Sequence, residues 1–431
     1  MKKILIPMIE VGGGHRMIAL AVKEAIDQLF PGQYQVDVID FAKEAGAIRD
    51  DKAMKDIWDF ALAHPRLTTN VNLLLDTFKY LTRSNLVTKV LFQNFIRRGA
   101  QYILEYKPDI VFSTHFFCTS VALFARKKYC FQYKVISYMA DPITGHNMWV
   151  NPEADIVVTA TEEAKKYLIS QGQPRYRIKV MSFPLNPKFF SKVTKTREEI
   201  LGSLGLDPSK KTVLASAGGQ GIGDTGKYVR FIYEKGYPLN IIAVCARNEA
   251  LFKELSSMVN KDSHTGIAVL GFVDNMHELL EASDFAITKA GPSTVFEHLV
   301  KRVPPILTHS AGLQEKGNAD FCLNNKVGWF INNQEELQDL MDRILNTAIL
   351  EEYRENIERN GFIRSLPQAP YDLARFVIGE LATKRKTRRS RKNTGLRRLV
   401  LGTRINIRIM MQKHKKTRYR IKKPDMKGGL N

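Results

Sequence analysis

The stretch Lys289-Ala290-Gly291-Pro292-Ser293-Thr294-Val295-Phe296-Glu297 decides how the chain is interpreted. An apolar run of strand length, residues 284–288, precedes it, and Pro292 with Ser293 is typical of a helix start. The stretch therefore predicts a strand, a glycine turn and a helix N-terminus. Such a terminus offers unpaired N–H groups and a partial positive charge, which suit a diphosphate, and Glu297 could accept the hydroxyls of a ribose. The alternative is an ordinary strand–helix connection with a surface Glu.

Apolar runs of strand length, mostly separated by helical lengths, recur on both sides of this stretch. Six are expected in a first half, at 3–9, 35–41, 109–114, 134–139, 155–160 and 179–183. Six are expected in a second half, at 212–217, 239–245, 267–272, 285–288, 305–308 and 328–331. Helices are predicted at 17–29, 334–359 and 371–383. The pattern predicts an α/β protein with two Rossmann-like halves facing a cleft, joined by the Pro- and Lys-rich stretch 184–208.

We place the domains at 1–190 and 191–383, followed by a basic tail at 384–431. The last helix, 371–383, could pack back on the first domain.

Each half has a glycine-rich loop after its first strand. Gly12-Gly13-Gly14-His15 follows the strand of the first half, and Gly218-Gly219-Gln220-Gly221 follows that of the second. Neither loop has the dinucleotide or Walker pattern, so NAD and ATP are not indicated. His15 stands at a helix start beside the C-terminal edge of a parallel strand, where such sheets bind ligands. A histidine that titrates near neutrality suits a general base there, and a purely structural histidine is the alternative.

The segment Asp141-Pro142-Ile143-Thr144-Gly145-His146-Asn147-Met148-Trp149 follows another strand and belongs to the expected cleft. Asp141 could orient His15 or an acceptor hydroxyl, and a turn-capping Asp is the alternative. Gln314 and Glu315 lie beyond the diphosphate loop and could take sugar hydroxyls. These features predict a nucleotide-sugar enzyme. The chain has no Asp-x-Asp motif at a strand end, so helix dipoles and loop amides, rather than a metal, are expected to stabilise the leaving group.

Charge and cysteine content narrow the class of protein. The formal charge is +21, and residues 384–431 hold 19 of the 65 Lys and Arg residues with one acidic residue, so the body is nearly neutral. The four cysteines form no CxxC pair, which favours buried, reduced thiols and a cytosolic setting. The apolar run 4–9 breaks at Glu10 and predicts a strand rather than a signal peptide. No apolar run approaches a membrane span of about 18 residues, so membrane contact is expected to be peripheral.

The interval 50–104 is rich in aliphatic and aromatic residues with basic residues among them. Core packing of two ordinary helices is one explanation. The other explanation is an apolar acceptor site, flanked by basic residues, that faces a bilayer.

These motifs together resemble the monogalactosyldiacylglycerol synthase and processive diacylglycerol glucosyltransferase family, within glycosyltransferase family 28. The resemblance rests on the GGGH loop, the segment 141–149, Val244-Cys245-Ala246-Arg247-Asn248, Gly271-Phe272-Val273, Thr288 to Pro292 and Gln314-Glu315-Lys316-Gly317-Asn318. It covers roughly residues 1–380. It implies a GT-B fold and an inverting, metal-free transfer of a hexose from a UDP-sugar to the hydroxyl of diacylglycerol. It further implies peripheral attachment to a membrane, and we expect the cytoplasmic face and an anionic surface.

The family pattern also assigns roles. His15 is the implied general base, with Asp141 beside it and Gly13, Gly14, His146 and Trp149 on the acceptor side. The implied diphosphate site has Gly218, Gly219, Gly291, Pro292, Ser293 and Thr294. Glu297 would hold the ribose, Arg247 and Phe272 the uridine neighbourhood, and Gln314, Glu315 and Asn318 the hexose.

Some positions depart from the family pattern. Ser293 and Ala246 stand where Gly is common, residues 309–312 replace a Pro-Gly approach, and the Asp141 to His146 spacing is one residue long. These departures leave the choice of glucose or galactose, the number of sugars and the acceptor open.

Two other functions are considered. The first is a related transferase acting on a polyprenyl-linked cell-wall intermediate. The second is a non-catalytic or nucleic-acid-binding protein on a GT-B scaffold. The basic tail could contact anionic lipid or be a solvated, disordered segment, and its single aromatic residue, Tyr419, disfavours base stacking.

Overall fold

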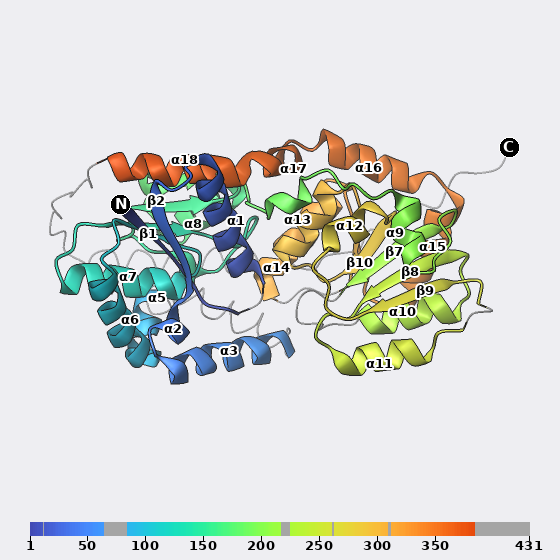
Figure 1. The fold of residues 1–431 in the computed structure, drawn as a ribbon, viewed down its shortest axis with the longest axis horizontal. Coiled ribbons are helices and arrows are strands. Elements are labelled where there is room, and N and C mark those ends of the chain that lie inside the picture. The colour runs from blue at the N-terminus through green and yellow to red at the C-terminus, as the bar shows by residue number, and fades with distance from the viewer. Residues whose placement is uncertain (12, 64–83, 217–224, 261–262, 309–311, 384–431) are drawn as a thin grey trace, which may run out of the picture. The chain divides into compact units, whose positions relative to one another are not determined.

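Two parallel β-sheets organise the protein. The computed structural model describes residues 1–11, 13–63, 84–216, 225–260, 263–308 and 312–383. Within these residues each sheet has six strands, in the orders β2-β1-β3-β4-β5-β6 and β12-β11-β10-β7-β8-β9. Figure 1 shows helices on the faces of both sheets. The predicted α/β architecture with two Rossmann-like halves is thereby confirmed.

The strands fall within a few residues of the predicted runs. Those of the first sheet are β1 (Lys2–Met8), β2 (Tyr34–Asp40), β3 (Ile110–Ser113), β4 (Lys134–Tyr138), β5 (Ile156–Thr159) and β6 (Ile178–Val180). Those of the second are β7 (Lys211–Ser216), β8 (Leu239–Val244), β9 (Gly266–Leu270), β10 (Phe285–Thr288), β11 (Pro305–Leu307) and β12 (Trp329–Phe330).

Both faces of the first sheet are buried, which explains its almost unbroken apolar strands. Along β1, Ile4 and Ile6 belong to one core cluster and Leu5 to the cluster on the opposite face. The first face is covered by α1 (Gly14–Leu29), α8 (Glu162–Ser170) and α18 (Ala369–Ala382). The other is covered by α2 (Phe41–Glu44), α3 (Ile48–Ala63), α6 (Gln93–Tyr106) and α7 (Phe116–Lys128), beside α5 (Ser84–Leu91).

The second sheet is built in the same way. Its faces pack against α9 (Arg197–Ser203) and α12 (Met276–Glu281) on one side, and α10 (Thr225–Glu234), α11 (Glu249–Ser257), α15 (Gln334–Asn346) and α16 (Ile349–Arg359) on the other. Helices α13 (Pro292–Val300), α14 (Gly312–Asn324) and α17 (Gly361–Ser365) join a cluster that also contains the first sheet.

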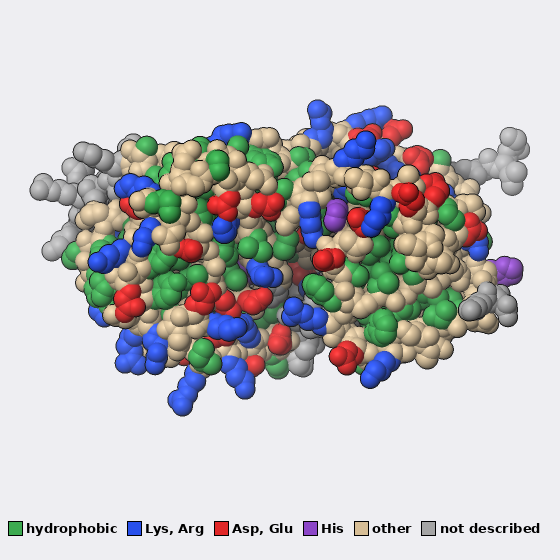
Figure 2. Space-filling view, viewed as in Figure 1, with side chains coloured by type: hydrophobic (Ala, Val, Ile, Leu, Met, Phe, Trp, Pro, Cys, Tyr) green, Lys and Arg blue, Asp and Glu red, His purple; other side chains and the backbone are tan. Residues whose placement is uncertain are grey.

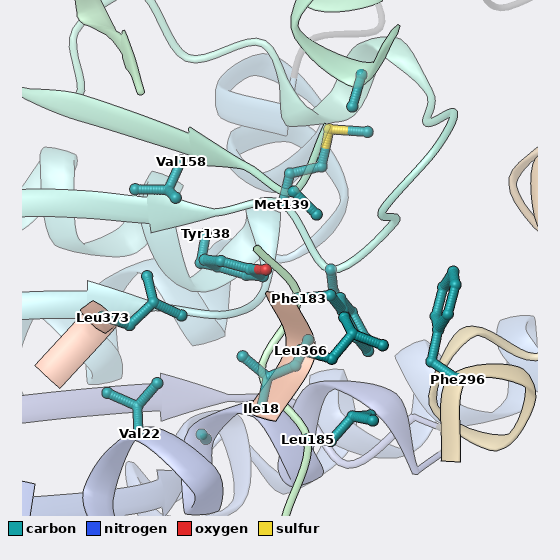
Figure 3. Close-up of a cluster of buried hydrophobic side chains, with 14 of the residues drawn as sticks. Ile18, Val22, Tyr138, Met139, Val158, Phe183, Leu185, Phe296, Leu366 and Leu373 are labelled. Carbon is teal, nitrogen blue, oxygen red and sulfur yellow. The ribbon is translucent and has the colours of Figure 1, made fainter. Parts of the chain in front are cut away.

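That shared cluster connects the two halves, and Met1–Arg385 form one compact unit. Figure 3 shows Phe183 and Leu185 as labelled neighbours of Phe296 of α13. Ile18 and Tyr138 of the first half lie further from Phe296 in the same cluster. Fully burying such a side chain contributes roughly 1.5–3 kcal/mol. The division at residues 190 and 191 stays a prediction.

Helix α18 lies against α1, at the opposite end of the chain (Figure 1). The Tyr371 hydroxyl lies 3.0 Å from Gln28 Oε1. Lys134, at the start of β4, donates to the Glu380 carbonyl at 2.6 Å and to Glu380 Oε2 at 2.8 Å. The last described helix is therefore anchored on the first half.

Two predictions about local structure were wrong. The helix predicted at 334–359 is two helices, because Thr347 has an extended backbone and its hydroxyl bonds back to the Arg343 carbonyl at 2.7 Å. The stretch 184–208, whose role as a linker stays a prediction, contains α9, which begins with a capping box of Thr196 and Glu199. Cys118, Cys245 and Cys322 are buried as expected, but Cys130 is exposed in the turn after α7.

Membrane-related predictions are tested in part. No helix in the described residues is long and apolar enough to cross a bilayer. Within the interval 50–104, residues 64–83 lie outside the described part of the chain. The tail 384–431 also lies outside it. In the described part, Phe92, Phe95 and Ile96 are core residues, whereas Val90 and Leu91 are exposed.

Candidate functional site

His15 lies in the first turn of α1, immediately after the glycine loop that follows β1. Its Nδ1 lies 2.6 Å from the carbonyl oxygen of Thr114, which follows β3. Because a carbonyl only accepts, Nδ1 carries the proton and Nε2 keeps a free lone pair. Burial lowers the pKa of His15 to about 4, against the hydrogen bond to Thr114, which raises it. The expectation of a near-neutral pKa is thus wrong for the ligand-free protein, in which His15 is an uncharged base.

Four aromatic side chains form a cluster beside His15, and two of them contact its ring. Its ring centroid lies 4.6 Å from that of His115 and 6.1 Å from that of Trp149. Phe116 lies 5.2 Å from Trp149 and 4.9 Å from His146. We call His115, Phe116, His146 and Trp149 the aromatic box. These rings cover part of His15, whose exposure is intermediate, and so contribute to its desolvation.

Thr114, His115 and Phe116 were missed by the sequence interpretation. The signal was available, since Ser113-Thr114-His115 is a polar run at the C-terminal end of a parallel strand, the criterion that selected Asp141. His115 also caps α7, because its Nδ1 accepts from the Phe117 N–H at 3.2 Å. That bond uses the Nδ1 lone pair and fixes the proton of the neutral ring on Nε2.

Asp141 orients Trp149, whereas His15 is oriented by Thr114. The Trp149 Nε1–H donates to Asp141 Oδ2 at 2.6 Å, and His146 Nε2 lies 3.9 Å from the same oxygen. Burial raises the pKa of Asp141 to about 7, the Trp149 bond lowers it and the charge of Glu315 raises it. His146 Nδ1 is buried and has no hydrogen-bond partner in the described residues. Such an unpaired atom is available to a ligand.

The second half presents the predicted turn and helix start. Gly291 is the N-cap of α13, and Pro292 stands at its first position. Ser293 Oγ is buried and, in the part of the chain that the structure describes, unpaired. The Thr294 carbonyl bonds to His298 Nδ1. Burial raises the pKa of Glu297 to about 7, and Lys188 lowers it.

Helix α14 carries the residues predicted for the hexose. Asn318 Nδ2 donates to the Ala290 carbonyl at 2.9 Å, and Asn318 Oδ1 is buried without a partner among the described residues. Glu315 Oε1 lies 3.6 Å from Lys289 Nζ and 3.7 Å from the position that a Cβ on Gly291 would take. Gln314 lies in α14, but its side chain, like Gly218, Gly219 and Gly12, is outside the described residues.

Arg247 and Phe272 form an exposed pair near the ends of β8 and β9. The guanidinium carbon lies 5.6 Å from the ring centroid, and Phe272 is 65% exposed. Ala246, beside Arg247, has a φ of 50°, in the region that favours glycine. This explains why glycine is common there in the family.

The N-termini of α1 in the first half and α13 in the second half lie close together. A Cβ on Gly14, one residue before His15, would lie 3.7 Å from Ser293 Oγ of α13. Gly13, by contrast, has no atom within 4 Å of such a position. The base is therefore beside the N-terminus predicted to hold a diphosphate.

Two family models match successive parts of the chain. The model for monogalactosyldiacylglycerol (MGDG) synthase matches residues 15–185, and that for the glycosyltransferase family 28 C-terminal domain matches residues 226–361. The chain is thus similar to monogalactosyldiacylglycerol synthase in its first half and to family 28 glycosyltransferases in its second. The first match begins at the candidate base, and the second contains α13 and α14.

Curated relatives agree with these two matches. A probable chloroplastic monogalactosyldiacylglycerol synthase of Nicotiana tabacum is 29% identical over 353 residues, which cover 79% of this chain and 64% of that protein. Monogalactosyldiacylglycerol synthase 2 of Arabidopsis thaliana is 28% identical over 394 residues, 89% of this chain and 82% of that protein. The chain thus spans just under two thirds of the tobacco relative.

Solved structures identify the fold. MurG of Acinetobacter baumannii aligns with a TM-score of 0.56 and 16% identity, covering 88% of this chain and all of that one. Anabaena HepE, solved with UDP-glucose, aligns with a TM-score of 0.55 and 13% identity over the same shares. At these identities the likeness is one of fold, and the predicted GT-B arrangement is confirmed.

Proposed function

We propose that the protein is an inverting glycosyltransferase that moves a hexose from a UDP-sugar to the hydroxyl of diacylglycerol. The observation that carries the proposal is the meeting of the two helix starts. His15, oriented with a free Nε2, begins one helix, and one residue before it Gly14 faces Ser293 of the other. A base and an anion-binding terminus side by side are what glycosyl transfer to a hydroxyl requires.

The reaction balances with these groups. The acceptor oxygen bonds to the anomeric carbon while the bond from that carbon to the diphosphate oxygen breaks. His15 Nε2 takes the hydroxyl proton, and UDP leaves with the bonding electrons. Attack opposite the leaving group converts an α-linked donor into a β-linked product. The amide groups at the start of α13 and the Ser293 hydroxyl stabilise the departing diphosphate.

The low pKa of His15 makes it a weak base, and a bound diphosphate would correct this. Its negative charge, close to His15, favours the imidazolium and raises the pKa of the histidine toward neutrality. The base therefore gains strength when the donor is in place. A hydroxyl would be deprotonated only beside a sugar that is ready to receive it.

The donor site is proposed on the second half. Glu297 would accept the ribose hydroxyls, and Arg247 with Phe272 would flank the uracil. Glu315, Asn318 and Gln314 would take the hexose hydroxyls. HepE was solved with UDP-glucose and Staphylococcus aureus MnaA with UDP, which supports a UDP-linked donor on this fold.

An exposed apolar face on the first half supports a lipid acceptor. On α3, Ile57 and Phe60 are 56% and 54% exposed, and on α5, Val90 and Leu91 are 61% and 63% exposed. Helix α5 contacts the turn Asn147–Trp149, which supplies Trp149 to the aromatic box. Figure 2 shows Lys and Arg side chains, with Asp and Glu side chains among them, where α3 and α6 lie. We propose that this face rests on an anionic membrane on its cytoplasmic side, close to the base.

No metal or other cofactor is part of the proposal, since helix termini and hydroxyls supply the charge stabilisation. Transfer is expected to survive treatment with EDTA and to show no dependence on added Mg²⁺ or Mn²⁺.

A transfer assay tests the function. The protein is mixed with diacylglycerol in anionic-lipid micelles and radiolabelled UDP-glucose or UDP-galactose, and the lipid phase is counted. Label in the lipid phase that alkaline deacylation converts to a β-glycosylglycerol supports the proposal. Binding of UDP without transfer to diacylglycerol would refute the acceptor and direct the search to polyprenyl-linked acceptors. Absence of UDP binding would refute the enzyme itself.

A further inference from the structure

Helix α14 of the second half touches the Asp141–Trp149 segment of the first half at one glycine. A Cβ on Gly317 would overlap Thr144 Oγ1 and would lie 3.1 Å from both Cβ and Cγ2 of Thr144. Rotation about χ1 of Thr144 can move Oγ1 but not Cβ, which stays 3.1 Å away, so the contact remains tight in any rotamer. Gly317 is buried, and even alanine does not fit the observed arrangement.

The backbone of α14 gives no other reason for glycine at this position. Gly317 lies inside a helix of 13 residues, where glycine is less favourable than alanine by about 1 kcal/mol. Its φ is not among the positive values of the described glycines, so no left-handed conformation requires it. Close approach to Thr144 is the reason that remains.

This contact lies in the middle of both functional segments. On α14, Glu315 precedes Gly317 by two residues and Asn318 follows it. On the other side, Asp141 precedes Thr144 by three residues. Asp141 receives the hydrogen bond from Trp149, whose ring lies 6.1 Å from that of His15. The groups proposed to bind the hexose and the base are thus linked through the contact between Gly317 and the Thr144 side chain.

We propose that Gly317 and Thr144 are positioning residues, whose close contact sets the distance between the hexose-binding groups of α14 and the base His15. The inference rests on the proposed function. It predicts that a larger residue at 317 separates the sugar from the base while the uridine and diphosphate sites, which lie on other elements, are unaffected. Attack on the anomeric carbon needs a near-attack geometry, in which a misplacement of about 1 Å reduces turnover on the order of 100-fold.

The test is Gly317→Ala, with kcat for transfer and Kd for UDP measured separately. We expect kcat to fall by roughly 100-fold and Kd for UDP to stay within about twofold. Gly202→Ala is the matched control, since Gly202 also lies in a helix and has no atom within 4 Å of a Cβ position. It should keep wild-type kcat and gain stability.

Compensating changes at Thr144 distinguish positioning from general damage. Thr144→Ala removes the overlapping oxygen and leaves a Cβ at 3.1 Å, and Thr144→Gly removes the whole side chain. In the Gly317→Ala background we expect kcat to rise with Thr144→Ala and further with Thr144→Gly. The two single variants at 144 supply the reference for a double-mutant cycle.

Four outcomes decide the matter. Graded recovery of kcat with constant UDP affinity supports the contact. An active wild type with unchanged kcat in Gly317→Ala overturns it. A loss in Gly317→Ala that neither change at Thr144 relieves, whether or not the variant folds, overturns it as well. An inactive wild type refutes the proposed function instead, which keeps the two failures apart.

Discussion

His15 Nδ1 and the carbonyl oxygen of Thr114 lie 2.6 Å apart, and this bond leaves the lone pair of His15 on Nε2, the nitrogen of the proposed base. Many histidine bases are oriented by a carboxylate. Here a main-chain oxygen does it, and the Thr114 hydroxyl returns a bond to the His15 carbonyl at 3.1 Å. The α1 start and the end of β3 are thereby fastened to each other.

The first prediction concerns this base. His15→Ala should reduce kcat for transfer by about 10²–10⁴-fold, because the hydroxyl loses its proton acceptor. The Kd for UDP should not change. His264→Ala, at an exposed position of the second half, is the control and should be fully active. Retention of more than a tenth of the wild-type kcat in His15→Ala would show that another group takes the proton.

The second prediction concerns the pH dependence of donor binding. Glu297 has a pKa of about 7 in the folded protein, against 4.5 in an unfolded chain, because burial disfavours its charged form. Only the ionised carboxylate accepts two ribose hydroxyls, so affinity for a UDP-hexose should be constant above pH 8 and weaken below pH 7. Calorimetric titration from pH 5.5 to 8.5 measures this. Glu297→Gln should bind more weakly, and its affinity should not fall below pH 7.

The same carboxyl has the opposite effect on stability. Between pH 4.5 and 7 the unfolded chain has released this proton while the folded chain retains it, so stability falls as pH rises. Glu297→Gln lacks this loss. Its thermal midpoint should therefore exceed that of the wild type by more at pH 8 than at pH 5. Equal differences at both values would argue against a raised pKa.

A third prediction uses the backbone of Ala246. With φ at 50°, alanine is in a region that is unfavourable for residues with a Cβ. Ala246→Gly should raise the free energy of unfolding by up to about 1 kcal/mol, measured by urea titration. Ala45→Gly, at a φ of −73°, should instead lower it. The expected gain disappears if Ala246 adopts an ordinary φ in solution.

The fourth prediction concerns the anchor of α18. Lys134→Met removes the donor to the Glu380 carbonyl and carboxylate, on a lysine side chain that is only 9% exposed. We expect unfolding to become easier by roughly 1–3 kcal/mol. Lys316→Met provides the comparison, because Lys316 and Asp320 are 59% and 48% exposed and their pair should contribute less than about 1 kcal/mol. Equal losses in the two variants would mean that the anchor has no special role.

The fifth prediction concerns the apolar face of α5. Replacing Val90 and Leu91 together by Glu should weaken binding to anionic vesicles by roughly tenfold or more, since two apolar side chains no longer enter the lipid. UDP affinity should be retained. Phe252→Glu on α11, where the ring is 38% exposed, is the control in the other half. Unchanged vesicle binding in the α5 variant would assign membrane contact to another surface.

The sequence predicted the fold well because parallel strands buried on both faces are continuous apolar runs. The run 285–288 is β10 without any change of bounds. The single helix predicted at 334–359 failed because helical periodicity continues across Thr347, whose side chain ends the first helix by bonding to the preceding turn. Periodicity indicates which face of a helix is apolar. It does not indicate a side-chain hydrogen bond to the backbone that ends the helix.

The candidate site was predicted only where side chains signal it. His15 and Glu297 stand out because polar residues near strand ends and helix starts are informative. Asn318, in the middle of α14, was implied only by the family resemblance. The carbonyl of Thr114 carries no such signal, since every residue has one. The fit of Gly317 against Thr144 joins residues 173 positions apart and depends on how two halves meet. The low pKa of His15 likewise results from rings supplied by other segments.

The anchoring of α18 on α1 has a consequence for synthesis at the ribosome. The apolar side of α1 is covered in part by Leu373, Ala374 and Val377, which are translated more than 340 residues later. The half that emerges first therefore stays incomplete until the half that emerges second has been made. For the same reason a gene fragment that ends at the linker should yield an aggregation-prone, chaperone-dependent product rather than an independently folded domain.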